Sequence, residues 1–422
     1  MNHFEYRGGA FCCEDVPLAD IANAAGTPVY VYSTATLERH YDVFKQAFAP
    51  REVLVAFAVK ANANIAVLAT LARKGAGADT VSQGEIERAL AAGIPPDRII
   101  FSGVGKTEDE LAFAVRTGVR QINVESTAEL ETLSRIAWAL KARAPVAIRV
   151  NPDVGAGGHD KISTGKSNAK FGVSPGQAKT LYARAAHDKH LDAKGLAVHI
   201  GSQIRDLAPL EAAFGVLRRL TEELRHEGLS VERLDLGGGL GVPYFNEPDP
   251  PSPTEYAATV SRVFDGLDIE LAFEPGRVIA GNAGVLLSRV VRVQERAERP
   301  NLVLDAGMND LIRPAIYDAY HDIKPARDPG DAPRHAYDVV GPICETGDTF
   351  TRNRELPALE EGDLVAFMTA GAYGAVMSST YNARALVPEV LVRGDRFEIV
   401  RRRWTVTDQL ALERTPDWLE EV

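Results

Sequence analysis

The sequence contains few cysteines and no long hydrophobic run. Of its 422 residues only three are cysteine, namely Cys12, Cys13 and Cys344. Three thiols at these positions form neither a disulfide framework nor a CxxC metal motif, so we expect no structural disulfide and no metal site. No apolar run approaches the roughly 18 residues of a membrane-spanning helix, and the N-terminal stretch MNHFEYRGGAFCCEDV contains acids instead of a signal-peptide core. These absences predict a cytoplasmic protein.

An excess of positive charge is also absent. Lys and Arg total 47 against 58 Asp and Glu, which gives a net charge of -11. This balance argues against nucleic acid and membrane partners, so an anionic small-molecule ligand requires a local binding site. An apolar fraction of 45% and a charged fraction of 25% are typical of a folded globular protein, and the length allows two domains.

Short apolar runs alternate with helical patterns between residues 53 and 273. The strand candidates are VLVAFAV (53–59), GAGADT (75–80), IIF (99–101), QINV (121–124), VAIRV (146–150), LAVHI (196–200), RLDL (233–236) and IELAF (269–273). The intervening stretches have apolar residues at helical spacing and often start with Ser, Thr or Gln and end with Gly. Eight such units predict a closed (β/α)8 TIM-like barrel of the α/β class. An open doubly wound sheet is the alternative, which the count of eight and the lack of an early GxGxxG disfavour.

The pattern changes after EPGR (274–277). The following apolar runs are β-rich and separated by Gly, Pro and Asp: VLLSRVVRV, NLVLDAG, AYDVVG, DLVAFM, PEVLV and FEIVRR. They predict a second, mostly antiparallel β domain. We place the barrel at residues 28–276 and the β-rich domain at residues 1–27 and 277–422, with the first 27 residues available to pair with the C-terminal sheet.

Lys60 lies at the end of a strand predicted to be buried, where an unpaired ammonium group is costly. One interpretation is that the strand ends there and the side chain reaches solvent. Other predicted strands also end in polar residues or glycines, namely Asp79, Ser82, Asn151, His199, Gly237 to Gly239 and Glu274. Because barrel active sites lie at the carboxyl ends of the strands, we expect these residues to share one rim.

These residue types suit pyridoxal 5′-phosphate. The Lys60 amine can form a Schiff base with the cofactor aldehyde, and GGGLG (237–241) with the turn at Gly276 can offer backbone donors to the phosphate. Glu274 can hold the proton of the pyridine nitrogen, and His199 can stack on the ring. Each feature also has a purely structural interpretation: a tight turn for the glycines, an ion pair for Glu274 and a structural hydrogen bond for His199.

The motifs AFAVKAN, HIGSQ, DLGGGLG, EPGR and GPICETGD together resemble the fold-type III pyridoxal-phosphate-dependent decarboxylases. The resemblance is strongest to members that convert meso-2,6-diaminopimelate to L-lysine and carbon dioxide, the last step of lysine biosynthesis. HDKISTGKSNAKFG (159–172), DAGMNDLIRPAIYDAYH (305–321) and GAYGAVMSSTYN (371–382) extend it over nearly the whole chain. The resemblance implies a carboxy-lyase with an alanine-racemase-like two-domain architecture, which works as a homodimer.

The resemblance also implies roles for individual residues. Lys60 is implied as the Schiff-base lysine and Cys344 as the proton donor, with Lys60 or water as other proton sources. The implied cofactor-binding residues are Lys60, Asp79, His199, Ser202, Gly238, Gly239, Glu274, Gly276, Arg277 and Tyr373. The implied substrate-binding residues are Arg277, Arg313, Tyr317, Glu345 and Tyr373. Cys344 and Glu345 are implied to reach the site from the partner subunit, so that active sites are shared across the dimer interface.

The implied substrate agrees with the charges of these residues. The distal end of diaminopimelate is itself an amino acid, so its pocket needs a cation for the carboxylate and an anion for the ammonium group. Arg277 and Arg313 provide the first and Glu345 the second, unless Arg313 is merely a surface loop residue. The alternatives are a decarboxylase of ornithine, carboxynorspermidine or a carrier-bound amino acid, an alanine racemase, a non-catalytic relative that binds the cofactor, and a phosphate-binding barrel without it.

Overall fold

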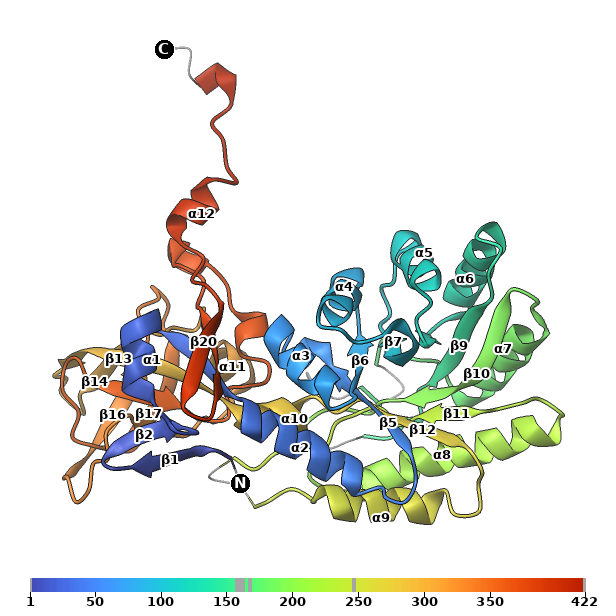
Figure 1. The fold of residues 1–422 in the computed structure, drawn as a ribbon, viewed down its shortest axis with the longest axis horizontal. Helices are drawn as coiled ribbons and strands as arrows, with labels where there is room; N and C mark the ends of the chain where they lie inside the picture. Colours follow the sequence, from blue (N-terminus) through green and yellow to red (C-terminus); the bar gives the residue numbers. More distant parts are fainter. Residues whose placement is uncertain (1, 156–163, 166–168, 245–247, 420–422) are drawn as a thin grey trace. The chain divides into compact units, whose positions relative to one another are not determined.

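The chain folds into two compact units in a computed structural model that describes residues 2–155, 164–165, 169–244 and 248–419 (Figure 1). The barrel unit spans residues 37–280, and the β-rich unit comprises residues 1–36 and 281–422. The sequence placed the start of the barrel at residue 28. The difference arises from strand β4 (Val29–Ser33), which pairs with strands of the β-rich unit.

Eight parallel strands close into a barrel, which confirms the predicted fold class. They are β5 (Val53–Ala58), β6 (Gly77–Thr80), β7 (Ile99–Phe101), β8 (Gln121–Val124), β9 (Ala144–Val150), β10 (Leu191–Val198), β11 (Arg233–Asp235) and β12 (Glu270–Phe273). The barrel closes where β12 pairs with β5, with Leu271 opposite Val53. Since the strands are covered on both sides, their sequences are continuous apolar runs and not alternating ones.

Helices precede, connect and follow the barrel strands, and several of them begin at a side-chain cap. They are α2 (Thr34–Gln46), α3 (Ile65–Arg73), α4 (Gln83–Ala91), α5 (Glu108–Thr117), α6 (Thr127–Ala139), α7 (Pro175–His187), α8 (Ala208–His226), α9 (Pro253–Val263) and α10 (Arg277–Ala280). Thr107, Ser174 and Ser252 form capping boxes that satisfy free amide groups at the helix starts. The predicted Ser and Thr starts are therefore confirmed at these three helices.

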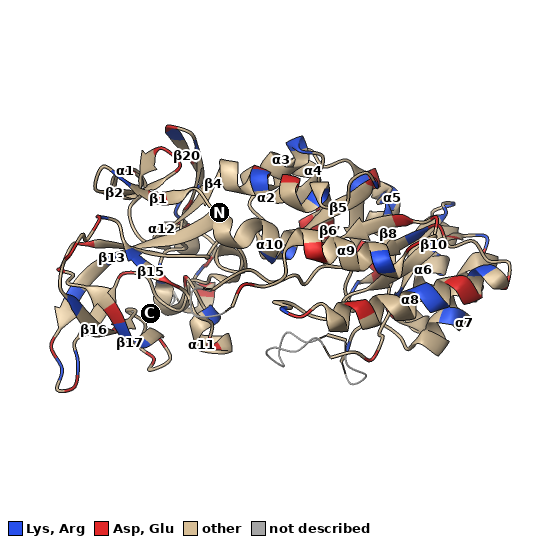
Figure 2. Cartoon of the chain, turned by 90° about the horizontal axis from the view of Figure 1, so that it is seen from below, with Lys and Arg blue, Asp and Glu red and all other residues tan. Residues whose placement is uncertain are grey.

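The barrel helices carry mixed charge on their outer faces. Figure 2 shows basic and acidic residues interspersed along α7 and α8. Lys179 of α7 pairs with Glu223 at 3.4 Å and Glu227 at 2.7 Å. The net negative charge of the chain is thus not gathered on this pair of helices. No helix in the described part of the chain has both the length and the apolar content needed to cross a membrane.

A mixed but mostly antiparallel sheet of nine strands forms the β-rich unit. Its main path runs β17-β16-β14-β13-β4-β19-β20, and β18 pairs with β13 and β15. Besides β4, the strands are β13 (Gly284–Gln294), β14 (Asn301–Leu304), β15 (Ile323–Pro325), β16 (Arg334–Val340), β17 (Thr349–Pro357), β18 (Leu364–Phe367), β19 (Glu389–Arg393) and β20 (Arg396–Arg401). Strand β17 was not predicted from the sequence, because its residues TFTRNRELP are mostly polar.

The N-terminal residues form their own small sheet. Strands β1 (Phe4–Arg7), β2 (Ala10–Cys13) and β3 (Val16–Pro17) pair antiparallel, and α1 (Leu18–Ala25) follows. The expected pairing of this segment with the C-terminal sheet is limited to a bridge between Ala10 and Arg327. Side-chain packing joins the two instead, since Phe11 and Cys13 belong to the same apolar core as strands β4, β13 and β19.

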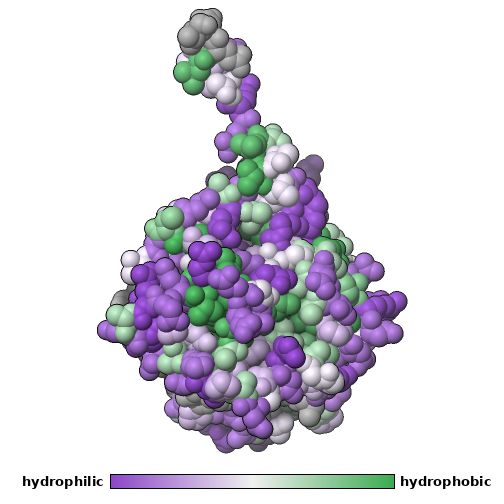
Figure 3. Space-filling model, turned by 90° about the vertical axis from the view of Figure 1, so that its left-hand side faces the viewer, coloured by the Kyte–Doolittle hydropathy of each residue, from purple (hydrophilic) through white to green (hydrophobic). Residues whose placement is uncertain are grey.

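The C-terminal segment after β20 includes the short helix α12 (Val406–Leu410) and exposes apolar side chains. Leu412 and Trp418 are 75% and 77% exposed, and Figure 3 shows green hydrophobic residues on this segment. Trp404 still forms a backbone bridge with Leu386. The residues beyond α12 therefore add little to the core of the β-rich unit.

Candidate active site

Lys60 lies just beyond the carboxyl end of β5, in the short 3₁₀ turn Val59–Ala61. Its Nζ atom is 2.6 Å from Oδ2 of Asp79, a residue within β6 whose side chain is fully buried. The lysine side chain itself is 35% exposed. The buried atom Oδ1 of Asp79 has no hydrogen-bond partner among the described residues. The ammonium group is thus held by a buried carboxylate, and its side chain stays accessible at the barrel mouth.

Glu274 follows β12, and a second acid lies beside it inside the barrel. Asp235, the last residue of β11, hydrogen-bonds Glu274, and both side chains are buried. Asp235 also accepts hydrogen bonds from Asn123 Nδ2 at 2.9 Å and from the backbone N–H of Gly237 at 3.0 Å. Ser102 Oγ donates to Glu274 at 3.4 Å. The structure therefore places four polar side chains from different strands in one network.

The pKa values of both carboxyl groups are raised. Burial is the main cause that raises the pKa of Glu274 well above its usual value, and the carboxylates of Asp235 and Asp79 raise it further. Burial also raises the pKa of Asp235, but the hydrogen bond from Glu274 and the donors of Asn123 and Gly237 oppose this. Two adjacent buried carboxyls do not both ionise, because their charges repel in a medium of low polarity. The pKa of Glu274 is raised more strongly than that of Asp235, because Asp235 accepts more hydrogen bonds.

His199 follows β10 and carries a neutral ring. Burial lowers its pKa well below the usual value, and the cations of Lys60 and Arg149 lower it further. The backbone N–H of Gly238 donates to His199 Nδ1 at 3.2 Å, which requires that this nitrogen be unprotonated. A flat, uncharged imidazole thus lies at the barrel mouth beside the glycine cluster.

The glycine cluster after β11 has no room for side chains. A Cβ atom on Gly238 would lie 2.2 Å from the carbonyl oxygen of Glu274. One on Gly239 would lie 2.4 Å from the carbonyl oxygen of Gly201, and Gly239 also has a φ of +112°. The bare backbone can therefore approach its neighbours or a ligand phosphate closely, as the sequence predicted for this motif.

Arg277 and Ser202 lie together at the carboxyl-end rim. Arg277 starts α10 directly after the buried Gly276 and is itself buried. Its Nη2 atom donates to Ser202 Oγ at 3.3 Å, and Nη1 donates to Tyr244 Oη at 3.0 Å. Arg277 and Ser202, which were both predicted to bind the cofactor, are thus in direct contact. Tyr244 was not predicted, because a single tyrosine before a proline-rich loop carries no recognisable signal.

A further buried ion pair supports the rim and was also missed. Arg149 Nη1 is 2.9 Å from Glu125 Oε1, and Glu125 also accepts from the backbone N–H groups of Gly103 and Gly172. Gly103 and Glu125 follow β7 and β8, and Arg149 lies near the end of the neighbouring strand β9. Of the motif at 159–172, residues 159–163 and 166–168 lie outside the described part of the chain. Gly172 belongs to its described remainder.

Four of the five predicted substrate residues belong to the β-rich unit, namely Arg313, Tyr317, Glu345 and Tyr373. Arg313 is only 6% exposed and begins α11 (Arg313–Tyr317), so it is not a surface loop residue. Its Nη1 atom lies 2.9 Å from His321 Nε2, and His321 Nδ1 lies 2.9 Å from the carbonyl oxygen of Met368. A carbonyl only accepts, so Nδ1 carries the proton and Nε2 accepts from Arg313. Tyr317 ends the same helix.

Tyr373 has an uncommon backbone conformation. Its φ is +56°, a region that non-glycine residues seldom occupy. Such conformations cost about 1–3 kcal/mol and often mark functional positions. Tyr373 lies in the segment GAYG between Gly371 and Gly374, and the structure leaves its side chain partly exposed. Its predicted role at the cofactor and substrate stays a prediction.

Cys344 and Glu345 are exposed neighbours on one loop of the β-rich unit. We call residues 341–348, with the sequence GPICETGD, the Cys-Glu loop. The backbone N–H of Cys344 donates to Asn382 Oδ1 at 3.2 Å, and Tyr381 Oη donates to Glu345 Oε1 at 2.5 Å. Asn382 and Tyr381 end the GAYGAVMSSTYN segment, and neither has a role predicted from the sequence.

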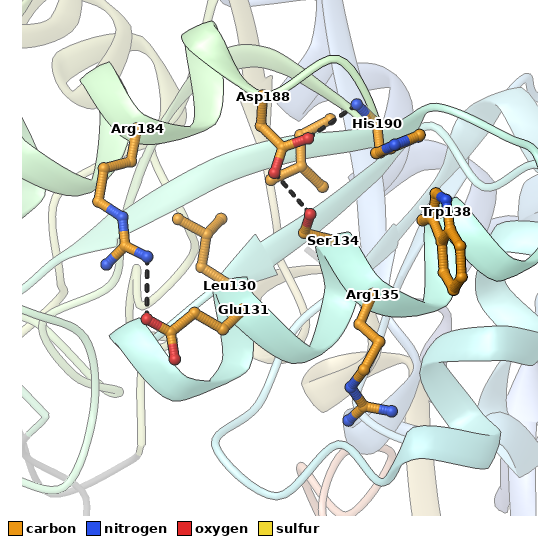
Figure 4. A pocket seen from close by; sticks show the side chains of 9 residues that line it. Leu130, Glu131, Ser134, Arg135, Trp138, Arg184, Asp188 and His190 are labelled. Carbon is orange, nitrogen blue, oxygen red and sulfur yellow. Dashed lines mark hydrogen bonds and ion pairs between the residues drawn. The ribbon is translucent and has the colours of Figure 1, made fainter.

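A surface cavity of about 370 Å³ lies beside α6 and α7 (Figure 4). It includes Asp188 and His190, which come just before the amino end of β10, whereas the predicted site lies at the carboxyl ends. Its polar groups are also satisfied: Ser134 Oγ donates to Asp188 Oδ2 at 2.5 Å, and Arg184 pairs with Glu131 at 2.9 Å (Figure 4). We therefore do not assign the active site to this cavity.

Comparison with known proteins defines the class that this fold and site represent. Residues 34–281 match the family described as pyridoxal-dependent decarboxylase, pyridoxal binding domain. The chain is 48% identical to the diaminopimelate decarboxylase of Zymomonas mobilis, with 99% of this chain and all of the relative covered. It is 49% identical to that of Pseudomonas aeruginosa, with 98% of this chain and 99% of the relative covered.

Solved structures agree with these relatives. Diaminopimelate decarboxylase from Helicobacter pylori in complex with L-lysine is 37% identical with a TM-score of 0.90, over 94% of this chain and 98% of the other. That from M. jannaschii is 34% identical with a TM-score of 0.94, over 99% of each chain. The chain therefore belongs to the diaminopimelate decarboxylase family of pyridoxal-dependent decarboxylases. The predicted family is confirmed.

The cofactor of this family is pyridoxal 5′-phosphate, as predicted, and the barrel residues fit it. Lys60 presents an accessible amine beside a buried carboxylate, and the glycines present a backbone without side chains. Glu274 and Asp235 supply a carboxyl pair that can accept a cationic ring nitrogen. When bound, the cofactor acts as an electron sink for the bond that breaks.

Proposed function

We propose that this protein decarboxylates meso-2,6-diaminopimelate to L-lysine and carbon dioxide. The observation that carries this proposal is its identity of 48–49% to two diaminopimelate decarboxylases over at least 98% of the chain. The barrel network around Lys60 and Glu274 supports the same reaction class. A related lysine/ornithine decarboxylase is only 23% identical and supports the fold alone.

The proposal gives each barrel residue a task. Lys60 provides the amine that holds the cofactor, and Asp79 keeps that amine near the mouth through the 2.6 Å contact. Glu274, backed by Asp235, holds the proton of the ring nitrogen. His199 covers the ring with a neutral imidazole. Ser202, Gly238, Gly239, Gly276 and Arg277 surround the phosphate, with Tyr373 from the β-rich unit.

The substrate requires both signs of charge at its distal end. Arg277 and Arg313 bind the distal carboxylate, and Glu345 binds the distal ammonium group, with Tyr317 and Tyr373 beside them. Cys344 donates a proton to the carbon that loses carbon dioxide. We further propose a homodimer in which Cys344 and Glu345 act in the active site of the partner subunit. The exposure of both residues in the single chain supports this arrangement.

The proposed reaction is tested by product analysis of the cofactor-loaded protein. We expect L-lysine and carbon dioxide from meso-diaminopimelate and no amine from L-ornithine, L-arginine or L-lysine offered in parallel. An equal rate with L-ornithine would contradict the two-charge pocket. If the protein binds the cofactor but does not turn over diaminopimelate, it either decarboxylates another amino acid or is a non-catalytic relative that binds the cofactor.

Shared active sites are tested by mixing two inactive variants. A Lys60→Ala subunit lacks the amine, and a Cys344→Ala subunit lacks the proton donor. If each site combines residues of two subunits, a mixed dimer has one intact site and one inactive site. Random reassortment makes about half of the dimers mixed, so about one quarter of the wild-type activity should return. No recovery after verified subunit exchange would contradict sharing. The cytoplasmic location remains a prediction that rests on the sequence.

A further inference from the structure

The Cys-Glu loop is fixed at its base by the carboxylate of Asp348. The two oxygens of this buried side chain accept from the backbone N–H groups of Met308 and Ile343, each at 2.6 Å. Backbone hydrogen bonds from Gly341 to Asp348 and from Asp348 to Glu345 close the loop further. Hydrogen bonds therefore fix the base of the loop, while residues 344–347 at its tip are exposed.

Two consecutive residues from another segment hold the tip of the loop. Tyr381 donates its hydroxyl to Glu345, and Asn382 accepts the backbone N–H of Cys344, at the distances given above. Asn382 has a φ of +56°, which asparagine tolerates better than most residues. Two consecutive residues of the loop, Cys344 and Glu345, thus each form a hydrogen bond with one of two consecutive residues of the other segment.

The contact between Tyr381 and Glu345 is not explained by fold stability. Tyr381 is 45% exposed and Glu345 is also exposed, and contacts between exposed polar groups add little to stability. The contact does restrict the carboxylate: Oε1 is occupied by the tyrosine hydroxyl, and Oε2 has no hydrogen-bond partner among the described residues. One oxygen is therefore held, and the other stays available to a ligand.

We propose that Tyr381 is a specificity-determining positioning residue that orients the Glu345 carboxylate toward the distal ammonium group of the substrate. The inference rests on the proposed function and names a residue that the substrate set did not include. A carboxylate already held in one orientation loses less rotational freedom when it binds a cation, so affinity and selectivity both rise. Asn382 provides the same support for the backbone of Cys344.

The test is Tyr381→Phe, with Tyr6→Phe as the matched control. Tyr6 donates its hydroxyl to the carbonyl oxygen of Pro325 at 2.8 Å in the same unit, and it is not part of the Cys-Glu loop. Both variants lose one hydroxyl hydrogen bond and keep the ring. For Tyr381→Phe we expect KM for diaminopimelate to rise on the order of tenfold, with a smaller change in kcat and unchanged cofactor absorbance. Tyr6→Phe should leave KM unchanged.

A binding measurement and a double variant complete the test. Competitive inhibition by L-lysine, which retains the distal amino acid, should weaken by a similar factor in Tyr381→Phe. In a Glu345→Gln background, Tyr381→Phe should have a much smaller effect on KM than in the wild type, because its partner is already changed. Equal KM values for the two tyrosine variants, or full additivity with Glu345→Gln, would overturn the inference. Absence of lysine formation by the wild type would instead overturn the proposed function.

Discussion

The barrel mouth and the Cys-Glu loop support their predicted site residues in different ways. In the barrel, Asp79, Asp235, Glu274 and Arg277 are buried, and their partners come from several strands. In the β-rich unit, Cys344 and Glu345 are exposed and are held by two residues of one nearby segment. Buried charges require complete networks, because an unpaired one is costly. An exposed loop has no such requirement, so a few hydrogen bonds from one segment are enough to hold it.

This comparison predicts that barrel variants change cofactor binding, whereas loop variants change substrate binding or turnover and leave cofactor binding unchanged. The largest effect is expected for Lys60→Ala. Without the amine, the protein should lose both the visible absorbance of the bound cofactor and all measurable turnover. Lys74→Ala is the control, because Lys74 pairs with Asp42 on the outside of the barrel unit at 2.7 Å. Retention of the absorbance in Lys60→Ala would contradict the role of this lysine.

Cys344→Ala should have the next largest effect. Loss of a general acid typically lowers turnover by about 10²–10⁴-fold, while the cofactor absorbance and the thermal midpoint should stay at wild-type values. Thr346→Ala changes an exposed residue of the same loop and should retain activity. Steady-state kinetics and a thermal melt check both. Full turnover in Cys344→Ala would assign the proton to Lys60 or water.

Gly238→Ala should affect the barrel itself. The new Cβ would lie 2.2 Å from the carbonyl oxygen of Glu274, so the backbone must shift. We expect a loss of about 1–3 kcal/mol in the free energy of unfolding together with weaker retention of the cofactor. Gly105→Ala is the control, since its Cβ would meet no atom within 4 Å. Denaturant melts and cofactor titration compare the two variants. Equal stability would show that the backbone around Gly238 can shift at little cost.

The smallest expected effect is a pH dependence of stability in the cofactor-free protein. Burial and the Asp79 carboxylate raise the pKa of Glu85 from 4.5 to about 7, against the hydrogen bond from the Val81 backbone. The folded chain then binds this proton more tightly than the unfolded chain, so the stabilising contribution is full below pH 4.5 and is lost as the pH rises through about 7. The advantage of Glu85→Gln should therefore grow across that window.

Glu255→Gln provides a control of opposite sign. Hydrogen bonds from the backbone and side chain of Ser252 lower the pKa of Glu255, so its contribution is present above the usual pKa and is lost on acidification. Relative to the wild type, the thermal midpoint of Glu85→Gln should rise between pH 4.5 and about 7, whereas the deficit of Glu255→Gln should shrink only as the pH falls below 4.5. A parallel shift of both with pH would contradict the assigned environments.

The sequence by itself determined the barrel and most of its chemistry. Strands β7 and β8 have the predicted bounds, because short apolar runs between turn signals define strands locally. Lys60, His199, Glu274 and the glycines lie at the carboxyl ends of their strands, since chain order fixes which residue follows each strand. The motif resemblance added the cofactor and the family.

Only the tertiary structure decided which residues become neighbours. Strand β4 pairs with β13 and β19, which lie more than 200 residues away in the sequence. A local sequence pattern does not reveal pairing over such a distance. Asp235 becomes the partner of Glu274, and Asn123 that of Asp235, only when the barrel closes. Tyr381 meets Glu345 across 36 residues through the packing of two loops. Local sequence specifies elements, whereas side-chain contacts depend on packing between distant segments.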